Sequence, residues 1–191
     1  MALPFLISVS GNIGAGKSSL LAALAKRGYY VQPEDFTKWG PLFNLALADP
    51  KRYKFSSQLK ILMVQMDLQR EHRNGTRPLV ILERASDCVL GFGKVAYDMG
   101  LMHMEEYRML EDIHAKLDAK VDLKILLDTP PDVCRVRIGN RDREFEQAIS
   151  NEYLTALHAQ FIDAADVKLS GLPPKEEVVE NFIKLLAQYN R

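Results

Sequence analysis

The sequence predicts an α/β fold with a five-stranded parallel sheet flanked by helices on both faces. Short apolar runs alternate along the 191 residues with longer stretches of helical periodicity, and this alternation is typical of parallel sheets with right-handed crossovers. The apolar runs are continuous, as expected for strands that are covered on both faces. A glycine-rich segment directly follows the first run. Without repeats, low-complexity tracts or an interdomain linker, residues 1–191 are expected to form a single domain.

Five strands and several amphipathic helices make up this expectation. The strands are predicted at residues 5–8, 28–31, 79–82, 123–127 and 166–169. Helices are predicted at residues 18–27, 55–73 and 105–117, after Pro130-Pro131-Asp132, and after Pro173-Pro174. Apolar residues recur at helical spacing in 55–73, and Asn74-Gly75 supplies a stop signal.

Composition and charge restrict the class of protein. With 47% hydrophobic and 26% charged residues the chain resembles an ordinary soluble globular protein. The 25 basic and 25 acidic residues cancel, so bulk charge points to neither a nucleic-acid nor a membrane partner. No apolar run approaches the roughly 20 residues of a membrane helix, and the N-terminus lacks the features of a signal peptide. Cys88 and Cys134 lack metal-ligand spacing, so reduced thiols and a cytoplasmic location are expected.

A phosphate-binding motif lies between the first predicted strand and the helix after it. Gly11-Asn-Ile-Gly-Ala-Gly-Lys-Ser18 fits the P-loop pattern. Its glycines allow successive N–H groups to point at an anion, and the helix N-terminus adds its dipole. Lys17 would reach the outer phosphates of ATP, and the Ser18 hydroxyl would ligate Mg²⁺. The alternative is a glycine-rich turn, but the pattern arises by chance in only roughly one chain in a hundred of this length.

Carboxylates follow two further strands, and both are expected at the edge of the sheet that carries the P-loop. Glu34 comes directly after the second strand and could accept the proton of an attacking hydroxyl; the alternative is a helix cap or a solvated acid. Glu83-Arg84 ends the third strand. Glu83 could organise Mg²⁺ and Arg84 could meet a phosphate or substrate oxygen, whereas the alternative is a structural ion pair.

A cluster of arginines lies late in the chain. Arg135, Arg137, Arg141 and Arg143 fall within nine positions and are followed by Glu144 and Glu146. This spacing predicts an arginine-bearing lid that closes over ATP, stabilises charge on the transferred phosphoryl group and excludes water. The alternative is a solvated, charged helix face.

In their order and spacing, these motifs resemble the deoxyribonucleoside kinase family, which has a P-loop kinase fold and includes deoxycytidine, deoxyguanosine and mitochondrial-type thymidine kinases and the insect multisubstrate enzyme. The resemblance covers residues 4–160. The matching segments are Gly11 to Ser19, Pro33-Glu34 with Trp39, Asp49-Pro-Lys-Arg-Tyr53 leading to Gln58, Glu83-Arg84, Arg137-Ile-Gly-Asn-Arg141-Asp-Arg143 through Glu146, and Glu152-Tyr153 through His158. Their combination is far more specific than any single segment.

The resemblance implies a role for each matching residue. The implied catalytic residues are Glu34 as general base on the 5′-hydroxyl, Arg84 beside the 5′-oxygen, and Lys17. The implied ATP-binding residues are Gly11, Asn12, Ile13, Gly14, Ala15, Gly16, Lys17, Ser18, Ser19, Arg137, Arg141 and Arg143. The implied substrate-binding residues are Ile13, Glu34, Trp39, Leu47, Gln58, Gln65, Arg84, Val89, Phe92 and Glu146. Ser18 and Glu83 are the implied Mg²⁺ residues.

The resemblance implies that the nucleoside pocket binds both the base and the sugar. Gln58 would hold the base through paired amide hydrogen bonds, which suit a pyrimidine edge. Glu146 would bind the 3′-hydroxyl, where family members usually have an assisting tyrosine in place of Leu47. For Ile13, ordinary core packing is an equal alternative.

Several positions depart from the family pattern. The usual Glu-Arg-Ser reads Glu83-Arg84-Ala85 here. Deoxycytidine-type members read the base with an arginine–aspartate pair, and Gln65 and Cys88 or Val89 occupy those places. This resembles the thymidine-accepting, multisubstrate branch. The adenine-binding loop is not assigned, with 166–174 as a candidate segment.

The expected function is transfer of the γ-phosphoryl group of ATP to the 5′-hydroxyl of a pyrimidine deoxynucleoside, thymidine or deoxycytidine or both. One alternative is a nucleoside-monophosphate kinase such as thymidylate kinase, which commonly has Asp-Arg after the third strand. A nucleotide-binding switch would lack the base and the lid arginines. The resemblance also implies a homodimer through long helices, although the apolar stripes of 55–73 and 105–117 could instead pack in the monomer core.

Overall fold

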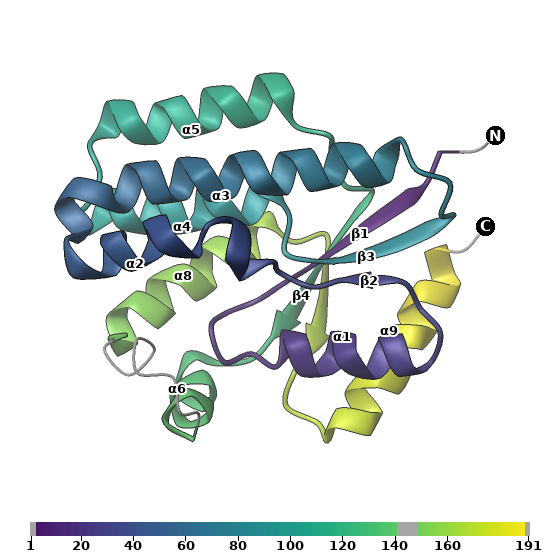
Figure 1. Ribbon diagram of the computed structural model, residues 1–191. Coiled ribbons are helices and arrows are strands. Elements are labelled where there is room, and N and C mark those ends of the chain that lie inside the picture. The colour runs from purple at the N-terminus through teal and green to yellow at the C-terminus, as the bar shows by residue number, and fades with distance from the viewer. Residues whose placement is uncertain (1–2, 141–148, 190–191) are drawn as a thin grey trace.

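The computed structural model describes residues 3–140 and 149–189 and contains a parallel sheet with helices on both faces (Figure 1). The five strands have the order β2-β3-β1-β4-β5 and pair in parallel throughout. They are β1 (Phe5–Ser10), β2 (Val31–Gln32), β3 (Leu79–Glu83), β4 (Leu123–Asp128) and β5 (Val167–Ser170). The predicted five-stranded parallel sheet is confirmed.

Two groups of helices cover the sheet (Figure 1). The helices are α1 (Lys17–Lys26), η1 (Phe36–Lys38), α2 (Gly40–Ala48), α3 (Pro50–Arg73), α4 (Ser86–Asp98), α5 (Met104–Leu117), α6 (Pro131–Gly139), α8 (Asn151–Ala164) and α9 (Lys175–Tyr189). Helices α1 and α9 lie on one face, and α3, α4, α5 and α8 lie on the other. None of the described helices combines the length and apolar character of a membrane span.

Buried side chains form a core on each face of the sheet. On the α1–α9 face, Ile7, Leu24 and Phe182 are fully buried in one cluster. On the opposite face, Leu62 and Leu110 occupy the interface of α3, α4 and α5. Both sides of the strands are therefore removed from water, which explains why the strands are continuous apolar runs.

The second strand begins later than predicted. Residues 28 and 29 belong to the turn after α1, because Gly28 N–H donates to Ala25 O and Tyr29 N–H donates to Leu24 O. Gly28 adopts a φ of +89°, which is the left-handed conformation that ends many helices. Strand β2 then occupies only Val31–Gln32.

Helix α3 starts five residues earlier than predicted, and α2 and α4 were not predicted. The Asp49 side chain accepts the Arg52 N–H and Pro50 occupies the first turn, so both residues begin α3. Gly91 and Gly93 weaken the helical signal of α4. A Cβ at Gly93 would lie 3.1 Å from Leu110 Cδ1, so the glycine allows α4 to pack closely against α5.

Gly14 fixes the path between β1 and α1. Its φ is +81°, and a Cβ there would lie 2.7 Å from Cys134 O and 3.1 Å from Ile138 Cγ1 of α6. Helix α6 therefore packs directly against the loop, and the loop has no space for a side chain at this position.

Gly14→Ala and Gly28→Ala form a matched pair, because both glycines have positive φ but only Gly28 has open space around it. We expect Gly28→Ala to lower the free energy of unfolding by about 1 kcal/mol through backbone strain alone. We expect Gly14→Ala to lower it by about 2–4 kcal/mol, because the clash with α6 is added. Urea denaturation measures both, and equal losses would contradict close packing of α6 on the loop.

Candidate active site

The carboxyl ends of β1, β2 and β3 bring the predicted residues to one edge of the sheet. Val9 pairs with Glu83 in the β1–β3 register, and Gln32 pairs with Leu82 in the β2–β3 register. Glu34 and Arg84 follow these positions directly, and the glycine loop follows β1. Ligands of open parallel sheets bind at this edge.

Lys17 lies inside the glycine loop. Its side chain is buried, and Nζ donates to Gly11 O at 3.0 Å and to Asn12 O at 2.9 Å. Burial and, to a smaller extent, the positive charge of Arg84 lower the pKa of Lys17 to about 7, and Glu83 and Glu34 oppose the shift. A polyanion in the loop would favour the charged ammonium. The loop is therefore arranged for a phosphate ligand.

Neighbouring side chains hold the loop backbone in place. Asn12 Nδ2 donates to Leu154 O of α8 at 2.8 Å, and Asn12 Oδ1 accepts the Ile13 N–H at 2.9 Å. Arg137 Nη1 and Thr129 Oγ1 both donate to Ala15 O, at 3.0 and 3.1 Å. These bonds fix the direction of the loop N–H groups, on which anion binding depends.

Ser18 and Glu83 present oxygen atoms next to each other. Ser18 is exposed at the start of α1, and its Oγ donates to Glu83 Oε1 at 2.7 Å. Glu83 is 7% exposed at the end of β3. A hydroxyl and a carboxylate oxygen are the donor types that Mg²⁺ prefers, so this pair fits the predicted metal site.

Glu34 and Arg84 form the central ion pair of the site. Arg84 Nη1 lies 2.6 Å from Glu34 Oε2, and both side chains are largely buried. The Arg84 guanidinium also lies over the Phe92 ring, 5.2 Å from its centroid. Burial opposes the charge of Arg84, but the nearby groups Glu34, Cys88 and Glu83, together with the hydrogen bond to Glu34, outweigh the burial, so the pKa of Arg84 is raised. The pair places a carboxylate and a guanidinium side by side next to the phosphate loop.

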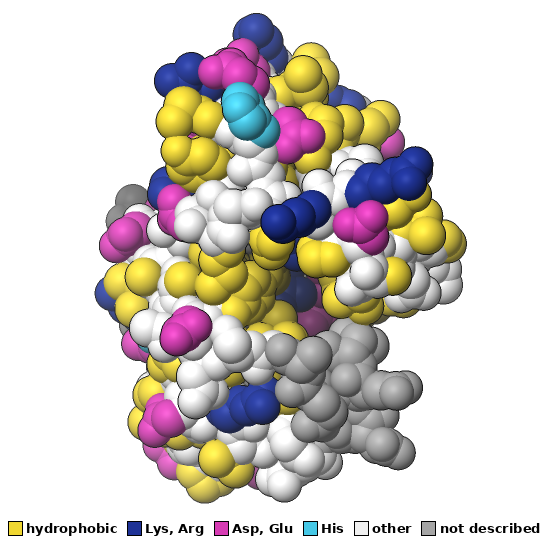
Figure 2. Space-filling view, turned by 90° about the vertical axis from the view of Figure 1, so that its left-hand side faces the viewer, with side chains coloured by type: hydrophobic (Ala, Val, Ile, Leu, Met, Phe, Trp, Pro, Cys, Tyr) yellow, Lys and Arg dark blue, Asp and Glu magenta, His cyan; other side chains and the backbone are white. Residues whose placement is uncertain are grey.

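Helices α3 and α4 bring the predicted base-pocket residues together. Trp39 and Val89 share one apolar cluster with α3, while Ile13 and Phe92 pack in the adjoining cluster on α8. Gln58 and Gln65 lie two turns apart on α3 and are both buried. Figure 2 views the molecule from the side that lies at the left of Figure 1. It shows a hollow bordered by hydrophobic side chains, with Lys or Arg and Asp or Glu atoms visible at its bottom.

Two buried polar atoms of this pocket lack partners. Within the described residues, neither Gln58 Oε1 nor Trp39 Nε1 has a hydrogen-bond partner. An unpaired buried polar atom costs roughly 1–3 kcal/mol, and a bound polar ligand would remove that cost for Gln58. The amide is thus available for base recognition.

Other predicted residues lie elsewhere. Leu47 is on α2 and is 45% exposed. Arg137 binds backbone, since its Nη2 donates to Gly171 O at 2.9 Å in addition to the bond with Ala15. Arg135 donates to Ile149 O at 2.7 Å. The predicted lid and substrate residues Arg141, Arg143 and Glu146 lie outside the described residues.

The structure adds a residue to which sequence reasoning gave no role. Tyr153 of α8 is largely buried beside Lys54, whose Nζ lies 5.9 Å from the ring centroid. Burial raises the pKa of Tyr153 to about 12, while Arg84 acts in the opposite direction. Tyr153 packs against the same cluster as Ile13 and Phe92, which places it near the site. Its position in the Glu152-Tyr153 motif was the available signal.

Comparisons with known proteins agree with this geometry. The family model described as deoxynucleoside kinase matches residues 7–184. A protein of Frog virus 3 (isolate Goorha), provisionally named a deoxynucleoside kinase, is 48% identical over 186 residues, which cover 97% of this chain and 95% of the relative. Deoxycytidine kinase 1 of Xenopus laevis is 28% identical over 187 residues, which cover 80% of this chain and 70% of that protein.

A solved structure shows the same fold. Deoxyadenosine kinase from M. mycoides, with dCMP and dCDP bound, superposes with a TM-score of 0.85 over 96% of this chain and 100% of that one, at 22% identity. The P-loop kinase fold expected from the motifs is confirmed. The matches support phosphorylation of a nucleoside rather than the thymidylate kinase alternative. The chain therefore belongs to the deoxynucleoside kinase family.

Proposed function

We propose that this deoxynucleoside kinase transfers the γ-phosphoryl group of ATP to the 5′-hydroxyl of a pyrimidine deoxynucleoside. The observation that carries the proposal is the Glu34–Arg84 pair, 2.6 Å apart, at the same edge of the sheet as the phosphate loop; the buried amide of Gln58 on α3 adds to it. A base, a phosphate cradle and a base-reading amide are the parts that this reaction needs.

Glu34 acts as the base in this proposal. As the nucleoside 5′-oxygen bonds to the γ-phosphorus, its proton passes to the Glu34 carboxylate, and the bond from the γ-phosphorus to the bridging oxygen breaks to release ADP. Because the transition state is loose, Glu34 mainly orients the hydroxyl. Arg84 holds the Glu34 carboxylate and offers its guanidinium to the oxygens that gain charge.

The phosphate loop supplies electrostatic stabilisation. Lys17 contributes a positive charge that the phosphates themselves favour, and the loop N–H groups bind their oxygens. Ser18 and Glu83 would hold Mg²⁺, which neutralises charge on the phosphates when bound. The connection after β5 lies beside the loop, since a Cβ at Gly171 would be 3.4 Å from Ala15 O. We propose this connection as the adenine-binding segment.

The pocket favours a pyrimidine. Gln58 offers an acceptor and two donors, which match the edge of thymine or cytosine. Gln65, Cys88 and Val89 add no charged group beside it, which leaves thymidine and deoxycytidine as substrates. Two of the relatives named above support this class, since one is a deoxycytidine kinase and the other carries the deoxynucleoside kinase name.

We also propose a cytoplasmic homodimer that supplies deoxynucleotides for DNA synthesis by salvage, with no nucleic-acid partner. Cys88 and Cys134 are buried and form no disulfide within the described residues, as suits a reducing compartment. Met63 of α3 and Met109 and Leu117 of α5 are each about half exposed, and these helices lie next to each other (Figure 1). Their apolar side chains suit a symmetric contact between long helices.

Phosphorylation assays with the purified protein, Mg²⁺ and ATP test the substrate class. We expect 5′-monophosphates from thymidine and deoxycytidine, at higher kcat/KM than from deoxyadenosine and deoxyguanosine, because the Gln58 amide fits a pyrimidine edge. Thymidylate is the control, since no turnover of it is expected. Turnover of thymidylate without any nucleoside would contradict the proposed function, and a preference for purines would contradict the base assignment.

Glu34→Gln should lower kcat by about 10²–10⁴ while ATP binding stays nearly unchanged, because the amide cannot accept the hydroxyl proton. The matched control is Asp35→Asn. Asp35 is the adjacent carboxylate and accepts the Thr37 N–H at 3.1 Å, so its variant should stay within about threefold of the wild type. Steady-state turnover and ATP titration measure both effects. Normal turnover of Glu34→Gln would exclude Glu34 as the base.

Ser18→Ala should raise the Mg²⁺ concentration for half-maximal activity by about tenfold, because one oxygen of the metal site is removed. Thr76→Ala removes an exposed hydroxyl before β3, at the opposite edge of the sheet, and should leave the Mg²⁺ dependence unchanged. Titration of activity with Mg²⁺ at saturating ATP distinguishes the two. Identical Mg²⁺ curves for Ser18→Ala and the wild type would exclude Ser18 from the metal site.

A further inference from the structure

The turn that carries Arg84 is strained and needs external support. Arg84 has a φ of +61° and is the one non-glycine residue with positive φ in the described ranges 3–140 and 149–189. Such a conformation costs about 1–3 kcal/mol and persists only where the surroundings hold it. On one side, Arg84 N–H donates to Val9 O of β1 at 3.1 Å. The other side of the turn, at Ser86, needs a second anchor.

Gln69 of α3 provides this anchor. Its Oε1 accepts the Ser86 backbone N–H at 2.7 Å, and its Nε2 donates to Asp118 Oδ1 at 2.9 Å and to Ala119 O at 2.7 Å. Gln69 and Ser86 are each only 1% exposed. A carboxamide can make these three bonds because it has one acceptor oxygen and two N–H donors. Neither a carboxylate nor an apolar side chain could replace it.

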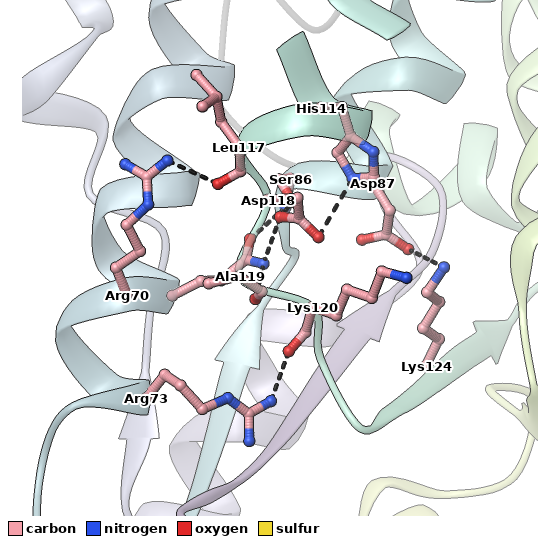
Figure 3. A network of polar contacts seen from close by, with 11 residues as sticks. Arg70, Arg73, Ser86, Asp87, His114, Leu117, Asp118, Ala119, Lys120 and Lys124 are labelled. Carbon is pink, nitrogen blue, oxygen red and sulfur yellow. Dashed lines mark hydrogen bonds and ion pairs between the residues drawn. The ribbon is translucent and has the colours of Figure 1, made fainter. Parts of the chain in front are cut away.

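Asp118 closes the network at the end of α5. Its Oδ1 also accepts the Ser86 hydroxyl, and its Oδ2 lies 3.6 Å from His114 Nε2. Figure 3 shows Ser86, Asp118 and Ala119 close together, with His114 beside them. Gln69 and Asp118 therefore bind both the backbone N–H and the hydroxyl of Ser86. In a buried network of this kind, loss of one member leaves others unpaired.

The connection between α5 and β4, which carries Asp118, is itself bound by arginines of α3. Arg70 Nη2 donates to Leu117 O at 2.6 Å, and Arg73 binds Lys120 O and Asp122 Oδ2. Asp122 Oδ2 in turn accepts the Leu6 N–H of β1 at 2.7 Å. Figure 3 shows these arginines reaching from α3 to the connection between α5 and β4. Asp118 is thus part of a fixed frame that connects α3, α5 and the sheet.

We propose that Gln69 and Asp118 are positioning residues for phosphoryl transfer. They fix the turn 84–86 and thereby hold the Arg84 guanidinium against the Glu34 carboxylate, although neither residue contacts Glu34 or the phosphate loop. The proposal deepens the proposed function and rests on it, because it requires Glu34 and Arg84 to act in catalysis. Small displacements of such groups have large kinetic effects, with about 10²-fold for a 1 Å shift.

Gln69→Leu tests the proposal by removing the amide at similar volume. We expect kcat for the best nucleoside to fall by about 10–100-fold, with the KM for nucleoside and ATP changed by less than about threefold. The matched control is Leu186→Ala, which removes buried apolar contacts in the cluster on the α1–α9 face of the sheet and leaves the network of Gln69, Ser86 and Asp118 unchanged. Its kcat should stay within about twofold of the wild type, even where its melting temperature falls as much as that of Gln69→Leu.

A double-mutant cycle separates positioning from general destabilisation. In an Arg84→Ala background, Gln69→Leu should cause less than about a threefold further loss of kcat, because the group that it positions is already absent. Asp118→Asn keeps an acceptor oxygen for Ser86 and Gln69 and should retain kcat within about threefold. Asp118→Leu should behave like Gln69→Leu. This pair of variants also tests the network where Gln69→Leu does not fold.

The outcomes are distinct. Equal losses from Gln69→Leu in the wild-type and Arg84→Ala backgrounds would overturn the proposal, as would Gln69→Leu or Asp118→Leu with wild-type kcat. Both results require a wild type that phosphorylates a nucleoside, so they leave the proposed function intact. A wild type without nucleoside turnover would instead overturn the proposed function, and the positioning role with it.

Discussion

The ion pair between Glu34 and Arg84 is the interaction on which the rest of the site depends. It joins the segment after β2 to the segment after β3, at 2.6 Å between Glu34 Oε2 and Arg84 Nη1. Removing either partner would leave a largely buried charge unpaired, which is far more costly than the loss of an exposed pair. The sheet, the turn at Arg84 and helix α4 must therefore all be arranged so that these two side chains stay in contact.

Support for the pair comes from two directions. From the sheet, Val9 O binds the Arg84 N–H, and the parallel register places Val9 opposite Glu83. From helix α3 and the end of α5, Gln69 and Asp118 hold Ser86 in a buried network. The strained backbone of Arg84 is stable because both sides are fixed, and this rigidity keeps the guanidinium beside the Glu34 carboxylate. The buried network that stabilises the core at this point therefore also fixes the geometry of the Glu34–Arg84 pair.

The conformation of the phosphate loop likewise depends on residues outside the loop. Glycines give the loop its shape, but Thr129 and Arg137 bind its backbone from outside, and Asn12 ties it to Leu154 of α8. Arg137, which the sequence predicts to contact phosphate, bonds in the structure to the backbone of Ala15 and Gly171. Such bonds are local in space and distant in sequence, so spacing alone could not reveal them.

The sequence by itself determined the class of fold, the phosphate loop and the residues of the Glu34–Arg84 pair. Continuous apolar strands and glycine spacing are local signals, so they are readable without the tertiary structure. Only the tertiary structure decided helix α4, whose signal Gly91 and Gly93 weaken, the start of β2 after Gly28, and the exposed position of Leu47. The contacts of Gln69 were also visible only in the tertiary structure. They join residues 17 and 49 positions apart, and such contacts leave no periodic pattern in the sequence.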